Sequence, residues 1–368
     1  MKKLSGVKLK HVIIGVGAGV LGMHRTALAL DTVELVGASD INATLGQKNA
    51  DELGCPFFTD YREMLETTKP DVSVILAPHP FHATLAVDCL NAGAHVLVEK
   101  PMAVQLSEAD AMIAAAEANE KHLAVSFQQR FRPEIRVARE LLQSGKLGRL
   151  LHVDMFINWF RARAYFQSAR WRATWSGEGG GVLVNQGIHD LDVLCYLFDS
   201  PKRLTAWTRT HLHDIEVEDT VQAMLEWEGF LGSFHTSTAE AGRKDSLDIV
   251  GTKGTLRVTP GGLIGNVFDV PLERFITESK SAWEQATMKP LEQSLPEGKG
   301  DHVSIYKHFH DALLNDEPLL ISGQEARKSL ELANAMIYSS YTKETVELPL
   351  DSQRYGELLE GLKQGVVK

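Results

Sequence analysis

The fold of this chain is decided by residues 11–22, HVIIGVGAGVLG. An apolar run that ends in glycines is typical of a buried parallel strand followed by a tight turn and a helix. Glycine lets the backbone turn sharply and approach a ligand closely, and the free amides of a helix N-terminus bind phosphate oxygens. The stretch therefore predicts a strand–turn–helix unit that binds the pyrophosphate of a dinucleotide.

The glycines allow two registers of this motif. Either Gly15 and Gly17 form the turn with Val20 in the third position, or Gly17, Gly19 and Gly22 complete a G-x-G-x-x-G pattern. The short strand favours the first register, with one residue inserted before the helix. We expect the cofactor phosphates to contact the backbone of Gly15, Gly17, Ala18, Gly19 and Val20.

The second strand candidate, VELVGASD (33–40), ends in an acidic residue 25 positions after Gly15. A carboxylate at Asp40 can accept hydrogen bonds from the adenosine ribose and would repel a 2′-phosphate. No Arg or Lys follows closely, since the next residues are Ile41, Asn42 and Ala43. We therefore predict NAD rather than NADP, bound partly by Asp40 and Ile41. The alternative is that Asp40 only ends a strand in solvent.

The first 128 residues alternate between strand-like and helix-like segments. Strand candidates continue at 72–78, 95–100 and 123–130, and helix candidates lie at 23–30, 43–54, 81–93 and 107–122. Gly54 stands where a helix C-cap belongs, and Ser107 with Asp110 has capping-box spacing. Continuous apolar strands between helices predict an α/β, doubly wound parallel sheet in a dinucleotide-binding domain of residues 1–128.

The pattern changes after residue 130. Helices are predicted at 133–148 and 187–198, and strands at 150–159, 203–212, 220–227, 231–240, 246–252 and 254–260. Residues 262–300 look irregular, and two helices close the chain at 302–315 and 322–343. This pattern predicts an α+β domain at 129–368, with helices on one side of a large, mostly antiparallel open sheet.

The totals exclude some classes of partner. A formal charge of −10 over 368 residues disfavours nucleic acid and anionic membranes, although a local basic pocket remains compatible with it. The early apolar run is too short for a signal peptide, and no stretch is long enough to span a bilayer. Cys55, Cys89 and Cys195 lie far apart without a CxxC, which indicates reduced thiols. We expect a cytoplasmic protein, and no metal, because HLHDIEVED (211–219) falls at a strand end.

Two segments carry residues suited to hydride transfer. The strand HVLVEK (95–100) ends in Lys100, where an ammonium beside apolar packing is costly unless it is used. Beside a nicotinamide, Lys100 could bind the reacting oxygen and stabilise alkoxide charge. In GEGGGVLVNQGIHDLDVL (177–194), His189 suits a proton acceptor at neutral pH. Its spacing predicts that Asn185 shares its helical face and that Asp192 could orient its ring.

The chain resembles the glucose–fructose oxidoreductase, inositol dehydrogenase and MocA family in six segments that occur in family order. These are GVGAGVLGMH (15–24), APHPFH (77–82), AGAHVLVEKP (92–101), QQRFRP (128–133), EGGGVLVNQGIHDLD (178–192) and IEVEDT (215–220). The resemblance implies a Rossmann domain followed by an α/β domain. It also implies a homodimer or homotetramer that packs through the open sheet.

The resemblance also implies roles for individual residues. Lys100 matches the active-site lysine of the EKP motif, and His189 matches the catalytic histidine. Pro78, His82 and Glu99 match positions lining the nicotinamide side, and Asn158 resembles a substrate-contacting asparagine. We also expect Ala77, His79 and Gln128 to contact the cofactor. Two residues depart from the family pattern. Asn185 stands where many members carry Asp and so cannot accept a proton, and His79 replaces a frequent Asn.

The stretch NWFRARAYFQSARWRATW (158–175) is dense in aromatic residues and arginines. A sugar site needs aromatic faces and polar forks, and the arginines could bind the carboxylate of a sugar acid. The predicted substrate-binding residues are Lys100, Asn158, Arg163, Tyr165, Trp171, Arg172, Asn185 and His189. The alternative is an exposed basic loop or an oligomer contact.

These residues favour an NAD-dependent dehydrogenase that oxidises a secondary alcohol of a sugar, sugar derivative or cyclitol. His189 would take the hydroxyl proton while hydride moves to the nicotinamide. One alternative is a non-catalytic NAD-binding regulator, which would not need both Lys100 and His189. Another is an NAD-dependent glycosidase that acts through transient oxidation. A third is an NADPH-dependent reductase, against which Asp40 argues.

Overall fold

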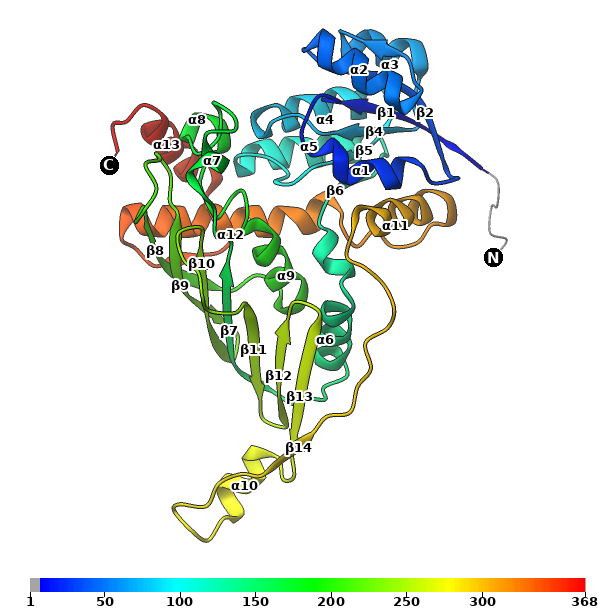
Figure 1. The fold of residues 1–368 in the computed structure, drawn as a ribbon. Coiled ribbons are helices and arrows are strands. Elements are labelled where there is room, and N and C mark those ends of the chain that lie inside the picture. Colours follow the sequence, from blue (N-terminus) through cyan, green and yellow to red (C-terminus); the bar gives the residue numbers. More distant parts are fainter. Residues whose placement is uncertain (1–6, 368) are drawn as a thin grey trace.

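The computed structural model describes residues 7–367 and contains two sheets (Figure 1). The first is entirely parallel, and its strand order is β3-β2-β1-β4-β5-β6. This order, with the reversal between β1 and β4, confirms the predicted doubly wound sheet. Its strands are β1 (Leu9–Ile14), β2 (Val33–Ser39), β3 (Phe57–Phe58), β4 (Val72–Ile75), β5 (His95–Val98) and β6 (Leu123–Val125).

Helices connect these strands: α1 (Leu21–Leu28), α2 (Ala43–Leu53), α3 (Tyr61–Thr68), α4 (His82–Asn91) and α5 (Leu106–Ala118). Gly54 ends α2 in the left-handed region, with φ +72°, as predicted. The capping box predicted at Ser107 and Asp110 is wrong. The helix α5 begins at Leu106, so Ser107 lies inside its first turn and is not the N-cap. Gln105 is the N-cap, and its side chain makes no capping bond.

The second sheet has the strand order β14-β13-β12-β11-β7-β10-β9-β8-β15. Every pair is antiparallel except β7 with β10, which confirms the mostly antiparallel sheet. Its strands are β7 (Leu150–Asn158), β8 (Arg203–Arg209), β9 (Thr220–Trp227), β10 (Phe230–Ser237), β11 (Ser246–Gly251), β12 (Gly254–Thr259), β13 (Gly262–Phe268), β14 (Met288–Pro290) and β15 (Val346–Glu347).

Burial alternates along these strands, so that one face of the sheet is covered and the other is open. Figure 1 shows α6 (Pro133–Gln143), α9 (Ile188–Phe198) and α12 (Gly323–Thr342) on the covered side. The open side exposes large apolar side chains at Trp207, Met224, Leu231 and Ile264. The same face also carries the ion pairs Arg203–Glu226 and Arg257–Asp248, so it is a mixed apolar and charged surface.

The prediction that residues 262–300 are irregular is partly wrong. They form β13 and β14, which add two strands to the edge of the sheet, and α10 (Leu272–Glu278), which lies on an arm that projects from the end of the sheet (Figure 1). Ile276 and Trp283 on this arm are exposed. Because the arm has little surface to pack against, its sequence shows no clear apolar period. The last helix, α13 (Ser352–Lys363), is an element that the sequence reading did not predict.

The C-terminal part of the chain returns to the first domain. Helix α11 (His302–Asn315) lies against α1, and α12 runs along the junction between the two sheets (Figure 1). Val125 at the end of β6 donates its amide hydrogen to Ile321 just before α12. The division into domains 1–128 and 129–368 therefore stays a proposal. Within residues 7–367, no helix combines the length and apolar character required to cross a membrane.

Candidate active site

The glycine turn after β1 uses the register with Gly15 and Gly17. Gly15 has φ +89°, and a Cβ there would lie 2.8 Å from the backbone nitrogen of Ala77. A Cβ on Gly17 would lie 2.8 Å from Oδ2 of Asp40. Position 15 therefore requires glycine, whereas a side chain at Gly17 would displace the carboxylate of Asp40. A Cβ at Gly19 would meet nothing within 4 Å, so the full G-x-G-x-x-G register is not the one the backbone needs.

The space beside this turn fits the pyrophosphate of NAD. Helix α1 begins at Leu21, and its N-cap, Val20, provides no side-chain cap. In residues 7–367 the amides of Gly19 and Val20 donate to no protein group. Free amides at a helix N-terminus bind anions, so this turn and the open space at Gly19 suit a pyrophosphate.

Asp40 lies at the carboxyl end of β2, where it closes the same turn. Its two carboxylate oxygens accept hydrogen bonds from the amides of Gly17 (2.7 Å) and Asn42 (2.8 Å). Each oxygen keeps a further lone pair for a ribose hydroxyl. Ile41 is 99% exposed beside it, which offers an apolar surface to a base. These features fit the ribose of NAD, and the Asp40 carboxylate would repel a 2′-phosphate.

His82 braces the two strand ends that border the site. Its Nε2 lies 2.7 Å from the carbonyl oxygen of Ala77, and its Nδ1 lies 2.8 Å from that of Pro101. The ring therefore joins the loop after β4 to the turn after β5. Pro78 and the buried His79 lie in the same loop, and burial holds the pKa of His79 well below its usual value. Their predicted contacts with the cofactor stay predictions.

Glu99 is buried behind Lys100 and is held by two histidines. Its Oε1 accepts from Nε2 of His24 (3.0 Å) and Nε2 of His302 (3.1 Å). Burial alone would raise the pKa of Glu99, but these hydrogen bonds keep it well below its usual value. His24 Nδ1 also lies 3.0 Å from the hydroxyl of Tyr306. A carboxylate charge is therefore kept next to Lys100.

The sequence reading missed His24 and His302, although His24 lies within the first family-like segment (15–24). The ligand atoms of His24, Glu99 and His302 lie within 4.8 Å of one another, a spacing that could also hold a metal ion. These atoms already form hydrogen bonds with one another, from His24 and His302 to Glu99. The predicted absence of a metal stays a prediction.

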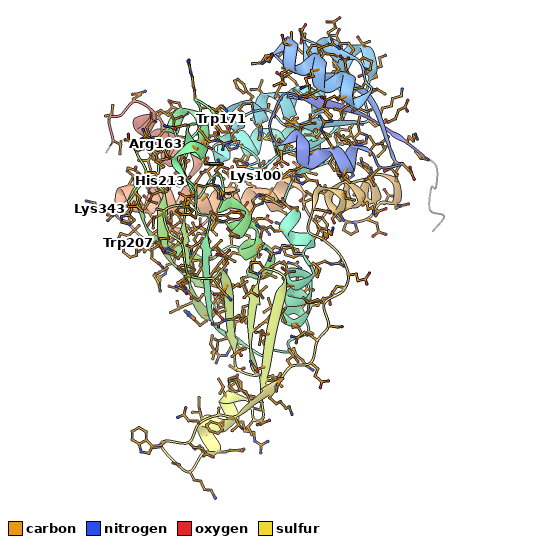
Figure 2. All side chains as sticks on the ribbon, viewed as in Figure 1. Lys100, Arg163, Trp171, Trp207, His213 and Lys343 are labelled. Atoms are coloured by element: carbon orange, nitrogen blue, oxygen red, sulfur yellow. The ribbon has the colours of Figure 1, made fainter. Side chains whose placement is uncertain are left out.

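Lys100 joins the two domains at the site. Its Nζ donates to the backbone carbonyl of Asn185 at 3.1 Å and lies 3.5 Å from the side-chain Oδ1 of the same residue. Burial lowers the pKa of Lys100, while the charges of Glu99 and Glu178 oppose that shift. Figure 2 shows Lys100 between the sheet of the first domain and the elements of the second.

His189 lies buried in the first turn of α9. The ring of Phe127 is 5.9 Å away and that of Trp159 is 6.4 Å away. Its Nδ1 is enclosed and has no hydrogen-bond partner among residues 7–367. Burial first, and then the charge of Lys100, lower the pKa of His189 to about 3. The imidazole is therefore neutral near pH 7 and able to accept a proton.

Two sequence expectations about His189 are wrong. Asn185 lies in the turns that precede α9, which begins at Ile188, so the two side chains do not share a helical face. Asp192 does not orient the imidazole. Its carboxylate binds Arg130 through Nε (2.8 Å) and Nη2 (2.6 Å), because a buried guanidinium requires a counter-charge.

Glu178 is a site residue that the sequence reading overlooked. It ends the short helix α8 (Trp175–Glu178) and is buried. Its Oε1 accepts from the side-chain amide of Asn185, and its Oε2 accepts from the amide of Ala173 at 2.5 Å. Burial raises the pKa of Glu178. The glycines on both sides of Glu178 predicted a flexible loop. The signal that could have identified the residue is a single acidic side chain within that glycine cluster.

The aromatic and basic segment does fold over the site. Trp171 packs against His79, with ring centroids 5.1 Å apart. The hydroxyl of Tyr165 accepts from Nη1 of Arg172 (2.6 Å) and from Nε2 of Gln186 (2.8 Å). Tyr165, Trp171 and Arg172 therefore lie together with the residues around Lys100, and their role in substrate binding stays a prediction.

Three other predicted residues lie differently. Arg163 is exposed on α7 (Arg163–Phe166), and Figure 2 places it away from Lys100. Asn158 ends β7, but its side-chain amide donates to the carbonyl of Arg243 (3.1 Å), which ties it to a loop. Gln128 begins the short helix η2 (Gln128–Phe131), and its Oε1 is enclosed without a partner in the described chain.

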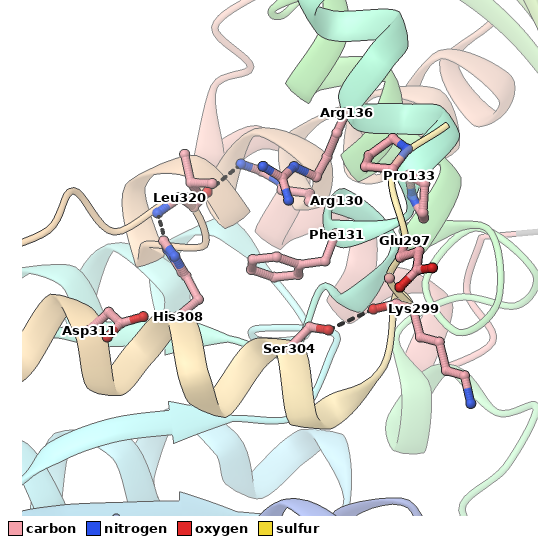
Figure 3. Close-up of a pocket in the computed structure, with 12 residues that line it drawn as sticks. Arg130, Phe131, Pro133, Arg136, Glu297, Lys299, Ser304, His308, Asp311 and Leu320 are labelled. Atoms are coloured by element: carbon pink, nitrogen blue, oxygen red, sulfur yellow. Dashed lines mark hydrogen bonds between the residues drawn. The ribbon is translucent and has the colours of Figure 1, made fainter. Parts of the chain in front are cut away.

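A pocket of about 300 Å³ lies between η2, α6 and α11 (Figure 3). None of the predicted site residues lines it, so it is separate from the candidate site. Its lining consists of Arg130, Phe131, Pro133, Arg136, Pro296, Glu297, Gly298, Lys299, Ser304, His308, Asp311 and Leu320.

Comparison with known proteins gives matches over both domains. Residues 9–127 match the profile of the oxidoreductase family with an NAD-binding Rossmann fold, and residues 135–257 match that of the GFO/IDH/MocA C-terminal domain. The WlbA dehydrogenase from Bordetella pertussis, solved with NADH and UDP-GlcNAcA, superposes with a TM-score of 0.79 at 28% identity. The superposition covers 94% of this chain and 100% of that one.

Curated relatives match over shorter lengths. The 1-carboxy-3-chloro-3,4-dihydroxycyclohexa-1,5-diene dehydrogenase of Comamonas testosteroni is 36% identical over 185 residues, which are 50% of this chain and 45% of the relative. The trans-1,2-dihydrobenzene-1,2-diol dehydrogenase of Mus musculus is 30% identical over 232 residues, 61% of this chain and 66% of the relative. With both domains matched, this chain belongs to the GFO/IDH/MocA family of oxidoreductases and carries its NAD-binding Rossmann domain.

Proposed function

We propose that this protein is an NAD-dependent dehydrogenase that oxidises a secondary alcohol of a sugar, sugar derivative or cyclitol. One observation carries the proposal. Lys100, from the first domain, binds the turn that precedes His189, and its charge helps to lower the pKa of that histidine. An ammonium and a neutral imidazole thus stand together at the carboxyl ends of the parallel strands, where ligands bind in such sheets.

Bound NAD would accept the hydride from the carbinol carbon. Lys100 Nζ donates a hydrogen bond to the substrate oxygen and stabilises the negative charge that develops on it. His189 takes the hydroxyl proton at Nε2, since its Nδ1 is the enclosed nitrogen. Glu99, held by His24 and His302, keeps a compensating negative charge near the ammonium.

Two relatives support the choice of substrate class. The names of the Comamonas and mouse proteins describe dehydrogenases of cyclic diols. A third relative, from Escherichia coli, is a D-glucoside 3-dehydrogenase that is 31% identical over 197 residues. A ring that bears vicinal hydroxyl groups is common to these substrates, and an aromatic residue such as Trp171 suits such a ring.

Assembly and location are also part of the proposal. A homodimer or homotetramer would cover the open sheet face with its exposed Trp207, Met224, Leu231 and Ile264. A second copy would supply the same open face, as in a two-fold symmetric interface. We propose a cytoplasmic location on the grounds of the charge and cysteine pattern given above.

The test is formation of NADH, followed by absorbance, with a panel of sugars, sugar acids, cyclitols and anhydrosugars. Lys100→Met and His189→Ala should each lower kcat about 10²- to 10⁴-fold, with NAD binding changed only a few-fold. The matched controls are the exposed Lys146→Met and His211→Ala, which should retain full turnover. Full turnover in either site variant would refute the role of that residue. Cleavage of a glycoside without net NADH would instead establish the glycosidase alternative.

A further inference from the structure

The segment that lies over the candidate site is rich in arginine. Residues 158–175 include four arginines and no Asp or Glu, in a chain whose formal charge is −10. Two of these arginines lie at the ring of Tyr165. The guanidinium carbon of Arg161 is 5.1 Å from the ring centroid and that of Arg172 is 4.4 Å from it.

A continuous set of contacts links these arginines to the reacting groups. The Tyr165 hydroxyl accepts from Gln186 at 2.8 Å, and Gln186 directly follows Asn185, whose carbonyl binds Lys100. Both arginines also lie close enough to Lys100 for their charges to lower its pKa. The arginines and Lys100 therefore border one region of the molecule.

Both arginines keep free donors. Arg172 uses Nε on the hydroxyl of Ser168 (3.1 Å) and Nη1 on Tyr165, and Arg161 uses Nη1 on the carbonyl of Phe160 (3.0 Å). Within residues 7–367, neither Nη2 donates to any group. A guanidinium carries five N–H donors in a planar fork, so each residue can still bind a planar anion.

The acids nearby are already occupied. Glu178 Oε1 lies 3.7 Å from Nη1 of Arg172, but it also accepts from Asn185. Arg161 forms no ion pair with any residue of the described chain. Three cations, Lys100, Arg161 and Arg172, thus border a region whose carboxyl groups already accept hydrogen bonds: Glu99 from His24 and His302, Glu178 from Asn185, and Asp190 from Trp159. An anionic ligand would complete the balance.

We propose that the substrate carries a carboxylate, bound by Arg161 and Arg172, on the same ring as the hydroxyl that faces Lys100 and His189. The substrate class is then an acidic cyclic alcohol: a sugar acid or a polyhydroxylated ring carboxylic acid. This inference rests on the proposed dehydrogenase function. In the reaction the carboxylate is unchanged, while the alcohol gives a ketone, a hydride to NAD and a proton to His189.

The test compares each acid with its own methyl ester, which keeps the ring and removes the charge. Shikimate, D-glucuronate and their methyl esters are the probes, and kcat/KM for NADH formation is the readout. Wild-type enzyme should favour the acids at least tenfold. Arg161→Met and Arg172→Met should each lower kcat/KM for the acid more than kcat/KM for the ester, so that the acid-to-ester ratio falls about 10- to 100-fold. The control is the exposed Arg170→Met.

Binding to the enzyme–NADH complex, measured by calorimetry with the same four compounds, decides the matter if none of them is oxidised. A preference for the acid that is lost in Arg172→Met supports the inference. If that variant does not fold, Arg161→Met and Arg172→Lys take its place. Equal binding of acid and ester, including no binding of either, overturns the inference. The dehydrogenase proposal fails separately, only if Lys100→Met and His189→Ala retain turnover of whichever alcohol is oxidised.

Discussion

The ion pair between Arg130 and Asp192 replaces the contact that the sequence suggested between Asp192 and His189. Its side chains are 1% and 0% exposed, so the pair is fully enclosed. Arg130 also donates to the carbonyl of Leu320 at 2.5 Å. The charge of Asp192 raises the pKa of Arg130 in spite of burial, so the guanidinium stays ionised. The pair therefore joins η2, α9 and the segment before α12.

Substituting Asp192→Asn would remove the buried counter-charge and leave the guanidinium with only the partly exposed Glu325, whose Oε2 lies 3.4 Å from Nη1. Removing one partner of a buried ion pair costs about 3–5 kcal/mol of unfolding free energy. Replacing both partners with apolar residues, as in Arg130→Met with Asp192→Leu, should recover most of that loss. The free carbonyl of Leu320 would retain a residual cost of about 1–3 kcal/mol.

Urea unfolding of the single and double variants measures these values. The control is Glu228→Gln in the surface ion pair with Lys202, in which Glu228 is 86% and Lys202 is 61% exposed. This substitution should change the unfolding free energy by less than about 1 kcal/mol. Because Asp192 does not contact His189, kcat per folded molecule should stay within a few-fold of wild type. A loss below 1 kcal/mol in Asp192→Asn, or a double variant no more stable than the single one, would refute this reasoning.

Three further predictions concern the cofactor, pH and assembly. Asp40→Ser should weaken the binding of NAD about tenfold and reduce the ratio of NAD affinity to NADP affinity, both measured by titration. If that affinity ratio is unchanged, Asp40 has only a structural role. Burial lowers the pKa of His11 to about 4 and that of His310 to about 3, so the fold holds their neutral forms and loses stability as pH falls below about 6.5. Each histidine should lower the unfolding free energy by up to about 1.4 kcal/mol per pH unit below pH 6.5, measured by urea unfolding. The variant His310→Phe should reduce the slope of unfolding free energy against pH. Trp207→Glu on the open sheet should reduce the mass measured by light scattering, and an unchanged mass would exclude this face from the assembly.

Local pattern was enough for the framework of the molecule. The run HVIIGVGAGVLG (11–22) specifies a strand, a turn and a helix because apolar period and glycine act over a few residues. Gly15 is required by contacts between that unit and its neighbouring strands. Lys100 and His189 could be singled out in the same way, since each stands at the boundary of a recognisable element.

Contacts between residues that lie far apart in the sequence were determined only by the tertiary structure. His24 and His302 meet at Glu99 because α1 and α11 pack together, and no local period reports that contact. Asp192 has the correct helical spacing to approach His189, yet Arg130 takes its carboxylate. A buried charged side chain pairs with the opposite charge that tertiary packing places beside it. The spacing of residues along one helix does not reveal which residue of another element that will be.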